Sequence, residues 1–148
     1  MVYLLIAAAG LLVAMQAGSN ATLQKSLQNP VMASVISFGS GLGVLLLALA
    51  IYTAFTRAPM PRGQQWSAIP WWGWIGGTLG AVYVLSGVLT AEKVGSGIFV
   101  GLSVTASIVA SIAIDHYGLL GFHRHAAGPG RILGGALMVA GMLLIGKF

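Results

Sequence analysis

Four polar residues recur at steps of four along one apolar stretch of the chain. They are Ser103, Ser107, Ser111 and Asp115. Because side chains four residues apart on a helix lie one above the other, this spacing predicts a polar stripe along one helical face. The hydroxyls of such a stripe can bind a polar solute, or they can bond back to the carbonyl four residues earlier. The three serines are therefore candidate substrate-binding residues, with a structural role as the alternative.

Asp115 is one of only two acidic residues in the chain. An ionisable group within a membrane segment costs free energy and often marks a transport pathway. On the functional interpretation, Asp115 and the adjacent His116 couple or gate transport by changing protonation or counter-ion state. On the structural interpretation, Asp115 is a helix-end residue at the membrane surface, paired with His116, Arg124, Arg131 or a neighbouring helix end.

A second polar site is predicted on the first apolar stretch. Gln16 and Asn20 are four residues apart, so they share a helical face. Their amides can bind a neutral or zwitterionic ligand, or they can join two helices at about 0.6 to 2 kcal/mol per hydrogen bond. Tyr83 and Ser86 could complete the pocket, although Tyr83 could equally be a core residue bonded to a carbonyl. No acidic residue accompanies these amides, which disfavours a cation-for-proton exchanger built on this helix.

Composition indicates what must position these residues. Of the 148 residues, 57% are hydrophobic and 6% are charged, and the mean hydropathy is +0.93. Such a chain has too little polar surface for a soluble globule, so we expect an all-α integral membrane protein. Residues 1–148 form a single transmembrane domain on this interpretation, with no room for a soluble catalytic module. The absence of cysteine excludes disulfides and thiol chemistry.

Five hydrophobic stretches are each close to the roughly 20 residues that a membrane-spanning helix needs. The first lacks a basic start and a clear cleavage site, so we expect a span and not a signal peptide. Gln28–Pro30 should end this helix, because proline disfavours the helical conformation at Asn29 and suits the opening turn of the next. Four tryptophans between residues 66 and 74 are typical of an interfacial belt. The expected spans are Val2–Leu27, Val31–Thr56, Trp71–Thr90, Gly97–Ile114 and Arg131–Gly146.

Enzymatic and cofactor motifs are missing from the sequence. No G-x-S-x-G, H-E-x-x-H or Walker-type loop occurs. His123 and His125 lie two residues apart in a loop with no further ligand nearby, which is the wrong context for a metal site. We expect no enzyme activity, no cofactor and no metal. The basic residues lie at the ends of the stretches, where they suit lipid headgroups better than nucleic acid.

Positive charge is divided almost evenly between the two sides of the predicted membrane domain. The N-terminal side carries Arg57, Arg62, Arg124 and Arg131, and the opposite side carries Lys25, Lys93 and Lys147. This difference of one barely biases insertion. Either another feature decides a fixed topology, or the chain inserts both ways and pairs antiparallel with itself. Glu92 and Lys93 are expected in a tight turn between the third and fourth helices.

Several motifs in a fixed order identify a family likeness. They are QAGSNATLQKSLQNPVMASVISFGSG, PWWGWIGGTLGAVYV, IDHYGLLG and GRILGGALMVAGMLLI. Together they resemble the YdcZ-like family, a five-helix branch of the drug/metabolite transporter superfamily similar in architecture to small multidrug-resistance exporters. The resemblance covers nearly the whole chain. It carries over to Gln16, Asn20, Asn29, Pro30, Pro70, Trp71, Trp72 and Asp115.

The resemblance implies a multi-pass protein of the bacterial inner membrane that transports a small molecule. Relatives occur as dual-topology homodimers, oppositely oriented pairs or fused two-domain chains. Where relatives have an amide in the middle of the fourth helix, this chain has Ser107, which puts substrate preference in doubt. We expect a secondary transporter of a small organic solute, with a second, inverted copy as its partner. The alternatives are a passive channel for a small ion or neutral solute, and a non-transporting membrane subunit.

Overall fold

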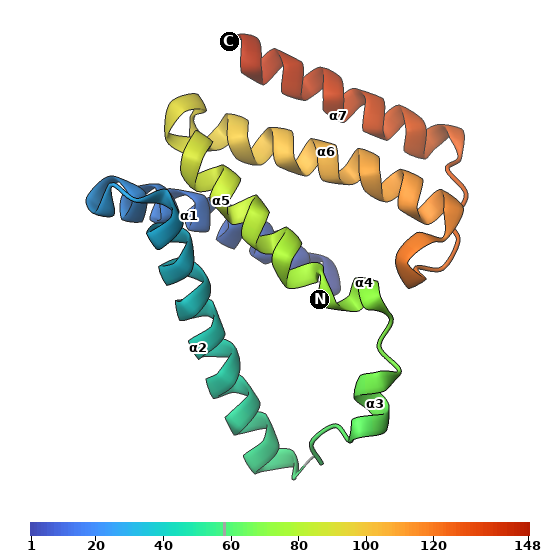
Figure 1. Cartoon of the computed structure of the whole chain (residues 1–148). Coiled ribbons are helices and arrows are strands. Elements are labelled where there is room, and N and C mark those ends of the chain that lie inside the picture. Colours follow the sequence, from blue (N-terminus) through green and yellow to red (C-terminus); the bar gives the residue numbers. More distant parts are fainter. Residues whose placement is uncertain (58) are drawn as a thin grey trace. The chain divides into compact units, whose positions relative to one another are not determined.

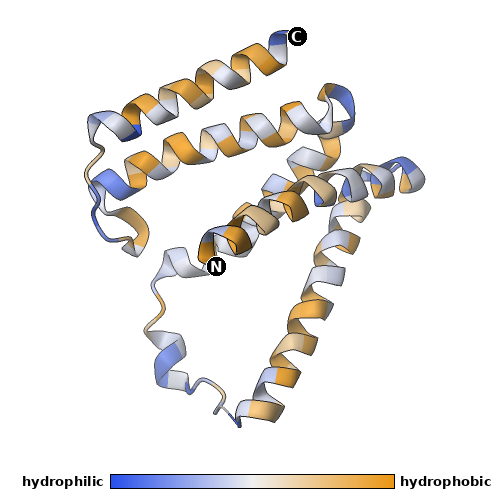
Figure 2. Cartoon of the chain, turned by 180° about the vertical axis from the view of Figure 1, so that it is seen from behind, coloured by the Kyte–Doolittle hydropathy of each residue, from blue (hydrophilic) through white to orange (hydrophobic). Residues whose placement is uncertain are grey.

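The computed structural model describes residues 1–57 and 59–148. Within these two ranges all regular elements are helices. Five of the segments are long and apolar enough to cross a membrane, and α4 and α5 together make the third of them. Figure 2 shows hydrophobic residues along the long helices and hydrophilic ones at their ends and in the loops. The elements are α1 (Val2–Leu27), α2 (Pro30–Thr56), α3 (Gly63–Ser67), α4 (Trp71–Trp74), α5 (Gly76–Val94), α6 (Ser96–Tyr117), the 3-10 turn η1 (Leu119–Gly121) and α7 (Pro129–Lys147).

The junction between α1 and α2 forms as the sequence predicts. Gln28 has a φ of 50°, which ends α1. Asn29 is extended, with φ −138° and ψ 103°, as expected for a residue before proline. Its side-chain Oδ1 accepts a hydrogen bond from the Met32 N–H at 3.0 Å, and Pro30 opens α2. A single Asn-Pro pair therefore both stops one span and caps the next.

The end of the third span differs from the prediction. We expected Glu92 and Lys93 in a turn, but α5 continues through both of them to Val94. Glutamate and lysine are good helix formers, so the helix runs on until Gly95, whose φ of 89° suits glycine. The fourth span also extends beyond Ile114 to Tyr117. Asp115 and His116 therefore lie within the last turn of α6.

The chain divides into two compact units, with boundaries inside α1 and α5. The first unit is Met1–Gly18 with Thr90–Phe148, and the second is Ser19–Leu89. In the first unit α6 and α7 run side by side and are joined by the loop that contains η1 (Figure 1). In the second unit Ala33 of α2 packs with Val84 and Val88 of α5, and Leu23 of α1 lies against them.

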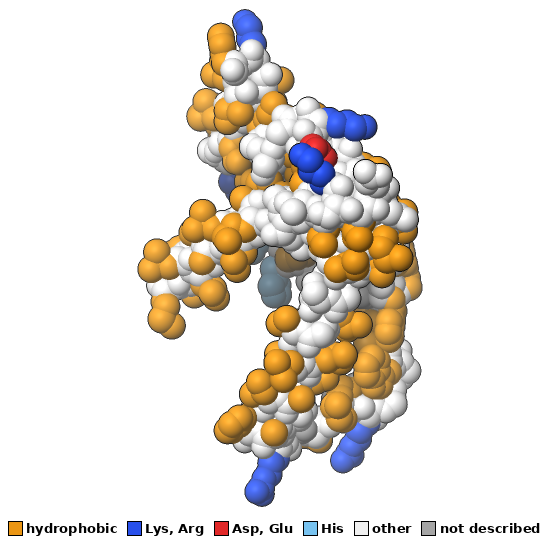
Figure 3. All heavy atoms as spheres, turned by 90° about the vertical axis from the view of Figure 1, so that its left-hand side faces the viewer, with side chains coloured by type: hydrophobic (Ala, Val, Ile, Leu, Met, Phe, Trp, Pro, Cys, Tyr) orange, Lys and Arg blue, Asp and Glu red, His pale blue; other side chains and the backbone are white. Residues whose placement is uncertain are grey.

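Most large apolar side chains are exposed, including Leu45 at 68% and Leu143 at 70%. In the space-filling view of Figure 3 these hydrophobic atoms cover long stretches of the helices, while lysine and arginine side chains stand mainly at helix ends. In a bilayer an apolar side chain can face lipid at no cost, so helices need no large buried core. This distribution suits membrane-spanning helices.

Candidate functional site

The end of α6 holds an ion pair between two of the predicted residues. The Arg131 guanidinium, in the first turn of α7, donates from Nη2 to Oδ2 of Asp115 at 2.5 Å. The side chain of Asp115 is 24% exposed and that of Arg131 is 42% exposed. Nη1 of Arg131 also donates to the backbone carbonyl of His125 at 3.3 Å. Of the partners considered from the sequence, Arg131 is therefore the one that pairs with the carboxylate.

The loop after η1 folds back onto the same helix end. The His125 N–H donates to the carbonyl of Asp115 at 2.8 Å, and Nε of Arg124 donates to the carbonyl of His116 at 3.1 Å. The His116 carbonyl thereby gains a side-chain donor at the helix terminus, and the Asp115 carbonyl gains a second donor beside the Gly118 N–H, which lies at 3.3 Å. The Ala127 N–H donates to Nδ1 of His116 at 3.1 Å. This bond ties the loop to the last turn of α6 through the His116 ring.

The serine stripe lies on α6 as predicted, and two of its hydroxyls bond to their own helix. Oγ of Ser103 donates to the carbonyl of Phe99 at 2.7 Å. Oγ of Ser107 donates to the carbonyl of Val104 at 2.8 Å. Ser103 is partly buried, whereas Ser107 and Ser111 are exposed. These bonds use the hydroxyl protons and leave the oxygen lone pairs of Ser103 and Ser107 able to accept from a solute.

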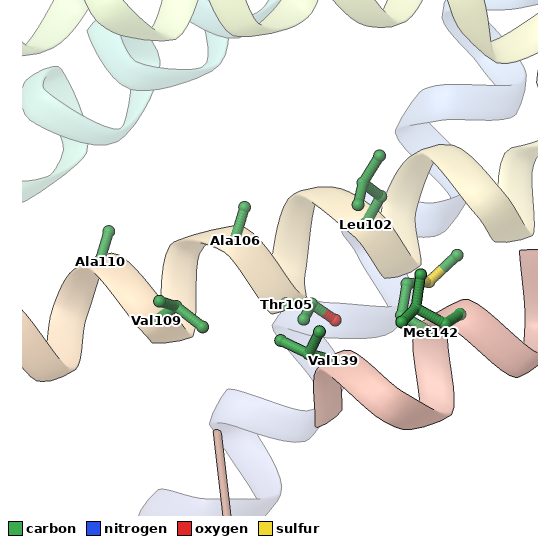
Figure 4. A pocket seen from close by; sticks show the side chains of 8 residues that line it. Leu102, Thr105, Ala106, Val109, Ala110, Val139 and Met142 are labelled. Atoms are coloured by element: carbon green, nitrogen blue, oxygen red, sulfur yellow. The ribbon is translucent and has the colours of Figure 1, made fainter. Parts of the chain in front are cut away.

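An apolar groove of about 430 Å³ runs along the α6 and α7 pair. Figure 4 shows its lining side chains rising from both helices, with the Thr105 hydroxyl as the one oxygen among the labelled residues. The groove suits hydrocarbon and offers almost nothing to a polar solute. It is therefore distinct from the serine stripe. Its lining residues are Leu102, Thr105, Ala106, Val109, Ala110, Val139, Met142 and Leu143.

The α1 amides differ sharply in burial. Gln16 belongs to the first unit and is exposed. Asn20 belongs to the second unit and is only 6% exposed. A third amide, Gln24, continues the same four-residue step, and its Oε1 is buried with no hydrogen-bond partner among the described residues. Gln24 is not among the residues expected from the sequence, although its four-residue spacing from Asn20 was the available signal.

Tyr83 and Ser86 lie on α5, outside the buried cluster of the second unit. Tyr83 is 37% exposed, and Oγ of Ser86 donates to the Tyr83 carbonyl at 2.7 Å. Their neighbours Val84 and Val88 are the residues that face the core. The structure thus joins Asp115 and His116 to one loop and buries Asn20, but it does not bring Tyr83 and Ser86 into the core cluster. Across the described ranges no three histidine or acidic side chains form a group that could hold a metal ion.

Comparison with known proteins gives one match, to a membrane transport family. The profile of the family described as "Putative inner membrane exporter, YdcZ" matches residues 1–144. No curated protein and no solved structure matches the chain. The family description favours a transport role over an enzymatic one. With five helices able to cross a membrane in the part of the chain that the structure describes, and a family match over nearly its whole length, the chain belongs to the YdcZ family and is a multi-pass transporter of the inner membrane.

Proposed function

We propose that the chain is a secondary transporter of a small organic solute that works by alternating access as an antiparallel homodimer. The same chain inserts in both orientations, and two inverted copies enclose a polar cavity. This arrangement supplies between two chains the inverted repeat that many secondary transporters contain within one chain. The odd number of spans fits this proposal, because a five-helix unit leaves its two ends on opposite sides of the membrane.

The observation that carries the proposal is the near-even distribution of positive charge. Five spans joined in series must alternate across the membrane. Their connections then place four arginines on one side and three lysines on the other. The lysines stand in the last turns of α1, α5 and α7. A difference of one residue gives the insertion machinery little reason to prefer either orientation.

The packing of α2 supports a second copy. Ideal Cβ atoms built on Gly39 and Gly43 meet no atom within 4 Å outside their own helix. Small residues at this spacing let helices approach closely in a bilayer, where association depends on van der Waals contact. Within the described residues of the second unit, Ser19–Leu89, these two glycines have no such neighbour. A helix of another chain is therefore a suitable partner for this face.

The polar residues of α1 and those of α6 have separate roles in this mechanism. The amides of Gln16 and Asn20 bind solute in the shared cavity, and the serine stripe of α6 lines a path towards Asp115. Asp115 and His116 couple or gate transport when the end of α6 is open to water, since both belong to the hydrogen-bonded end of that helix. Rocking of one protomer against the other would expose the cavity alternately to the two sides.

The topology is tested by fusing the C-terminus to a fluorescent reporter active only inside the cell, and separately to a phosphatase active only outside. Activity from both fusions, in cells that express only this chain, is the expected result. Signal from one reporter alone would exclude the antiparallel pair.

Transport is tested with purified protein in liposomes. Counterflow of a labelled solute is the expected behaviour, because a carrier exchanges solute through one alternating site. Unitary currents without coupling to a counter-gradient would instead identify a passive channel. The absence of both counterflow and currents across a broad solute panel would favour a non-transporting subunit whose polar residues only hold helices together.

A further inference from the structure

We infer that the solute is uncharged and donates hydrogen bonds, and that Asn20 and Gln24 of α1 receive it. This inference rests on the proposed transport function and names the class of substrate. It adds Gln24 as a binding residue. Two independent observations support it, namely an unpaired buried acceptor in the second unit and the position of every acidic side chain at a helix end.

The first observation is a buried asparagine and a buried glutamine oxygen one helical turn apart. Asn20 is 6% exposed, and Oε1 of Gln24 is buried without a hydrogen-bond partner among the described residues. Four-residue spacing places both amides on the same side of α1 as Leu23, which packs against Ala33, Val84 and Val88. A buried acceptor without a donor is costly. A ligand that brings an N–H or O–H group to Gln24 removes that cost.

The depth of the pair also suits a solute site. Asn20 lies seven residues before the end of α1 at Leu27, which is about 10 Å along a helix that rises 1.5 Å per residue. Gln24 lies one turn closer to the surface. A solute moving inward from this end of α1 meets Gln24 first and Asn20 next.

The second observation disfavours a permanently charged cation as the ligand. The chain has only two acidic residues, and both stand in the last turn of their helices, Glu92 in α5 and Asp115 in α6. Asp115 is already paired with Arg131. A charged group within the membrane usually pairs with an opposite charge, and a carboxylate is the counter-charge that a cation would use. The interior of the spans supplies amides and hydroxyls in its place.

The test measures binding and counterflow separately, with three kinds of probe. The uncharged donors are erythritol and nicotinamide, the cation without donors is tetraphenylphosphonium, and the anion is benzoate. The variants are Asn20→Leu, Gln24→Leu and Gln24→Glu. The matched control is Gln64→Leu, which removes an exposed amide in α3.

We expect the unaltered protein to bind an uncharged donor. Asn20→Leu and Gln24→Leu should each weaken the affinity for this probe about tenfold, because each removes a hydrogen bond. The control should bind as the unaltered protein does. Gln24→Glu supplies the missing carboxylate and should shift preference towards tetraphenylphosphonium. Gln24→Leu should also melt no lower than the unaltered protein, because it replaces an unpaired buried acceptor with an apolar group.

Three results would overturn the inference. One is preferred binding of the cation or the anion by the unaltered protein. Another is the absence of binding by either uncharged probe. The third is a lower melting temperature or loss of the dimer in Gln24→Leu, which would make Gln24 a structural contact between helices. Counterflow of a charged probe would overturn the inference about the substrate class but would still support the proposed transport function. Binding of an uncharged probe without counterflow would contradict only the proposed function.

Discussion

Asp115 and Arg131 face each other across the loop that joins α6 to α7, with Nη2 of the arginine 2.5 Å from Oδ2 of the aspartate. The pair connects the last turn of one span to the first turn of the next. Because both side chains are partly exposed, the direct contribution of this pair to stability is small, less than about 1 kcal/mol. A role of this pair in transport can therefore be tested by substitutions that should leave the fold intact.

Replacement of Asp115 should impair transport more than it impairs stability. We expect Asp115→Asn to abolish coupled uptake or to change its pH dependence, with only a small decrease in melting temperature. The double variant Asp115→Asn/Arg131→Gln restores charge balance without the carboxylate. If Asp115 serves coupling, the double variant stays inactive in liposome uptake. Recovery of uptake in the double variant would show that Asp115 only neutralises Arg131.

His116 should hold the loop through its Nδ1, which accepts a hydrogen bond from the Ala127 N–H at 3.1 Å. Removal of this acceptor leaves the Ala127 N–H without its partner on α6. We expect hydrogen exchange at the Ala127 amide to be faster in His116→Leu and close to normal in His116→Asn, whose side-chain oxygen can accept in place of Nδ1. Equal exchange rates in the leucine variant and the unaltered protein would show that this bond does not hold the loop.

The spans and the α1–α2 junction could be predicted from the sequence because they depend on local properties. Hydropathy and length identify a membrane helix, and proline restricts both its own φ and the preceding residue. The continuation of α5 through Glu92 and Lys93 was missed because their charges resemble those of a surface turn. Their helix propensity and the position of Gly95 decided the outcome.

The candidate site could be predicted only in part. A four-residue step places Ser103, Ser107 and Ser111 on one helix face and allows back-bonding, but it does not say which hydroxyls bond back. Those of Ser103 and Ser107 do so. Arg131 was one of several possible partners for Asp115, and the choice depends on how the loop folds. The burial of Gln24 depends on contacts between helices, which no local pattern contains.

Gly135 should tolerate a large side chain less well than its neighbour Gly134. A Cβ at Gly135 would lie 3.2 Å from Cδ1 of Ile112, whereas one at Gly134 meets nothing within 4 Å. Both substitutions gain similarly in helix propensity, so their difference reports packing between α6 and α7. We expect Gly135→Leu to be less stable than Gly134→Leu by about 1 to 3 kcal/mol, the usual cost of overpacking. Thermal unfolding in detergent measures this difference in stability. Equal melting temperatures of the two variants would contradict the close packing of Gly135 against Ile112.

The Asn29 cap should stabilise the start of α2. Its Oδ1 accepts from the Met32 N–H, and loss of such a cap usually costs about 1 kcal/mol. We expect Asn29→Ala to lower the melting temperature, while Asn29→Asp and Asn29→Ser, which can still accept this bond, should lower it less. An alanine variant as stable as the aspartate variant would show that the cap is not needed once Pro30 has set the backbone.

Single charge changes should shift the balance of orientations in opposite directions. Lys147→Ala leaves two lysines opposite four arginines, so more chains should retain the arginine side in the cytoplasm. Arg57→Asn lowers the arginine side to three, and asparagine tolerates the left-handed conformation of that position, where φ is 51°. With C-terminal reporters, we expect Lys147→Ala to raise external phosphatase activity and to lower internal fluorescence, and Arg57→Asn to do the reverse. If the ratio of phosphatase activity to fluorescence is unchanged in both variants, a feature other than charge fixes the topology. The distribution of lysine and arginine then no longer supports two orientations.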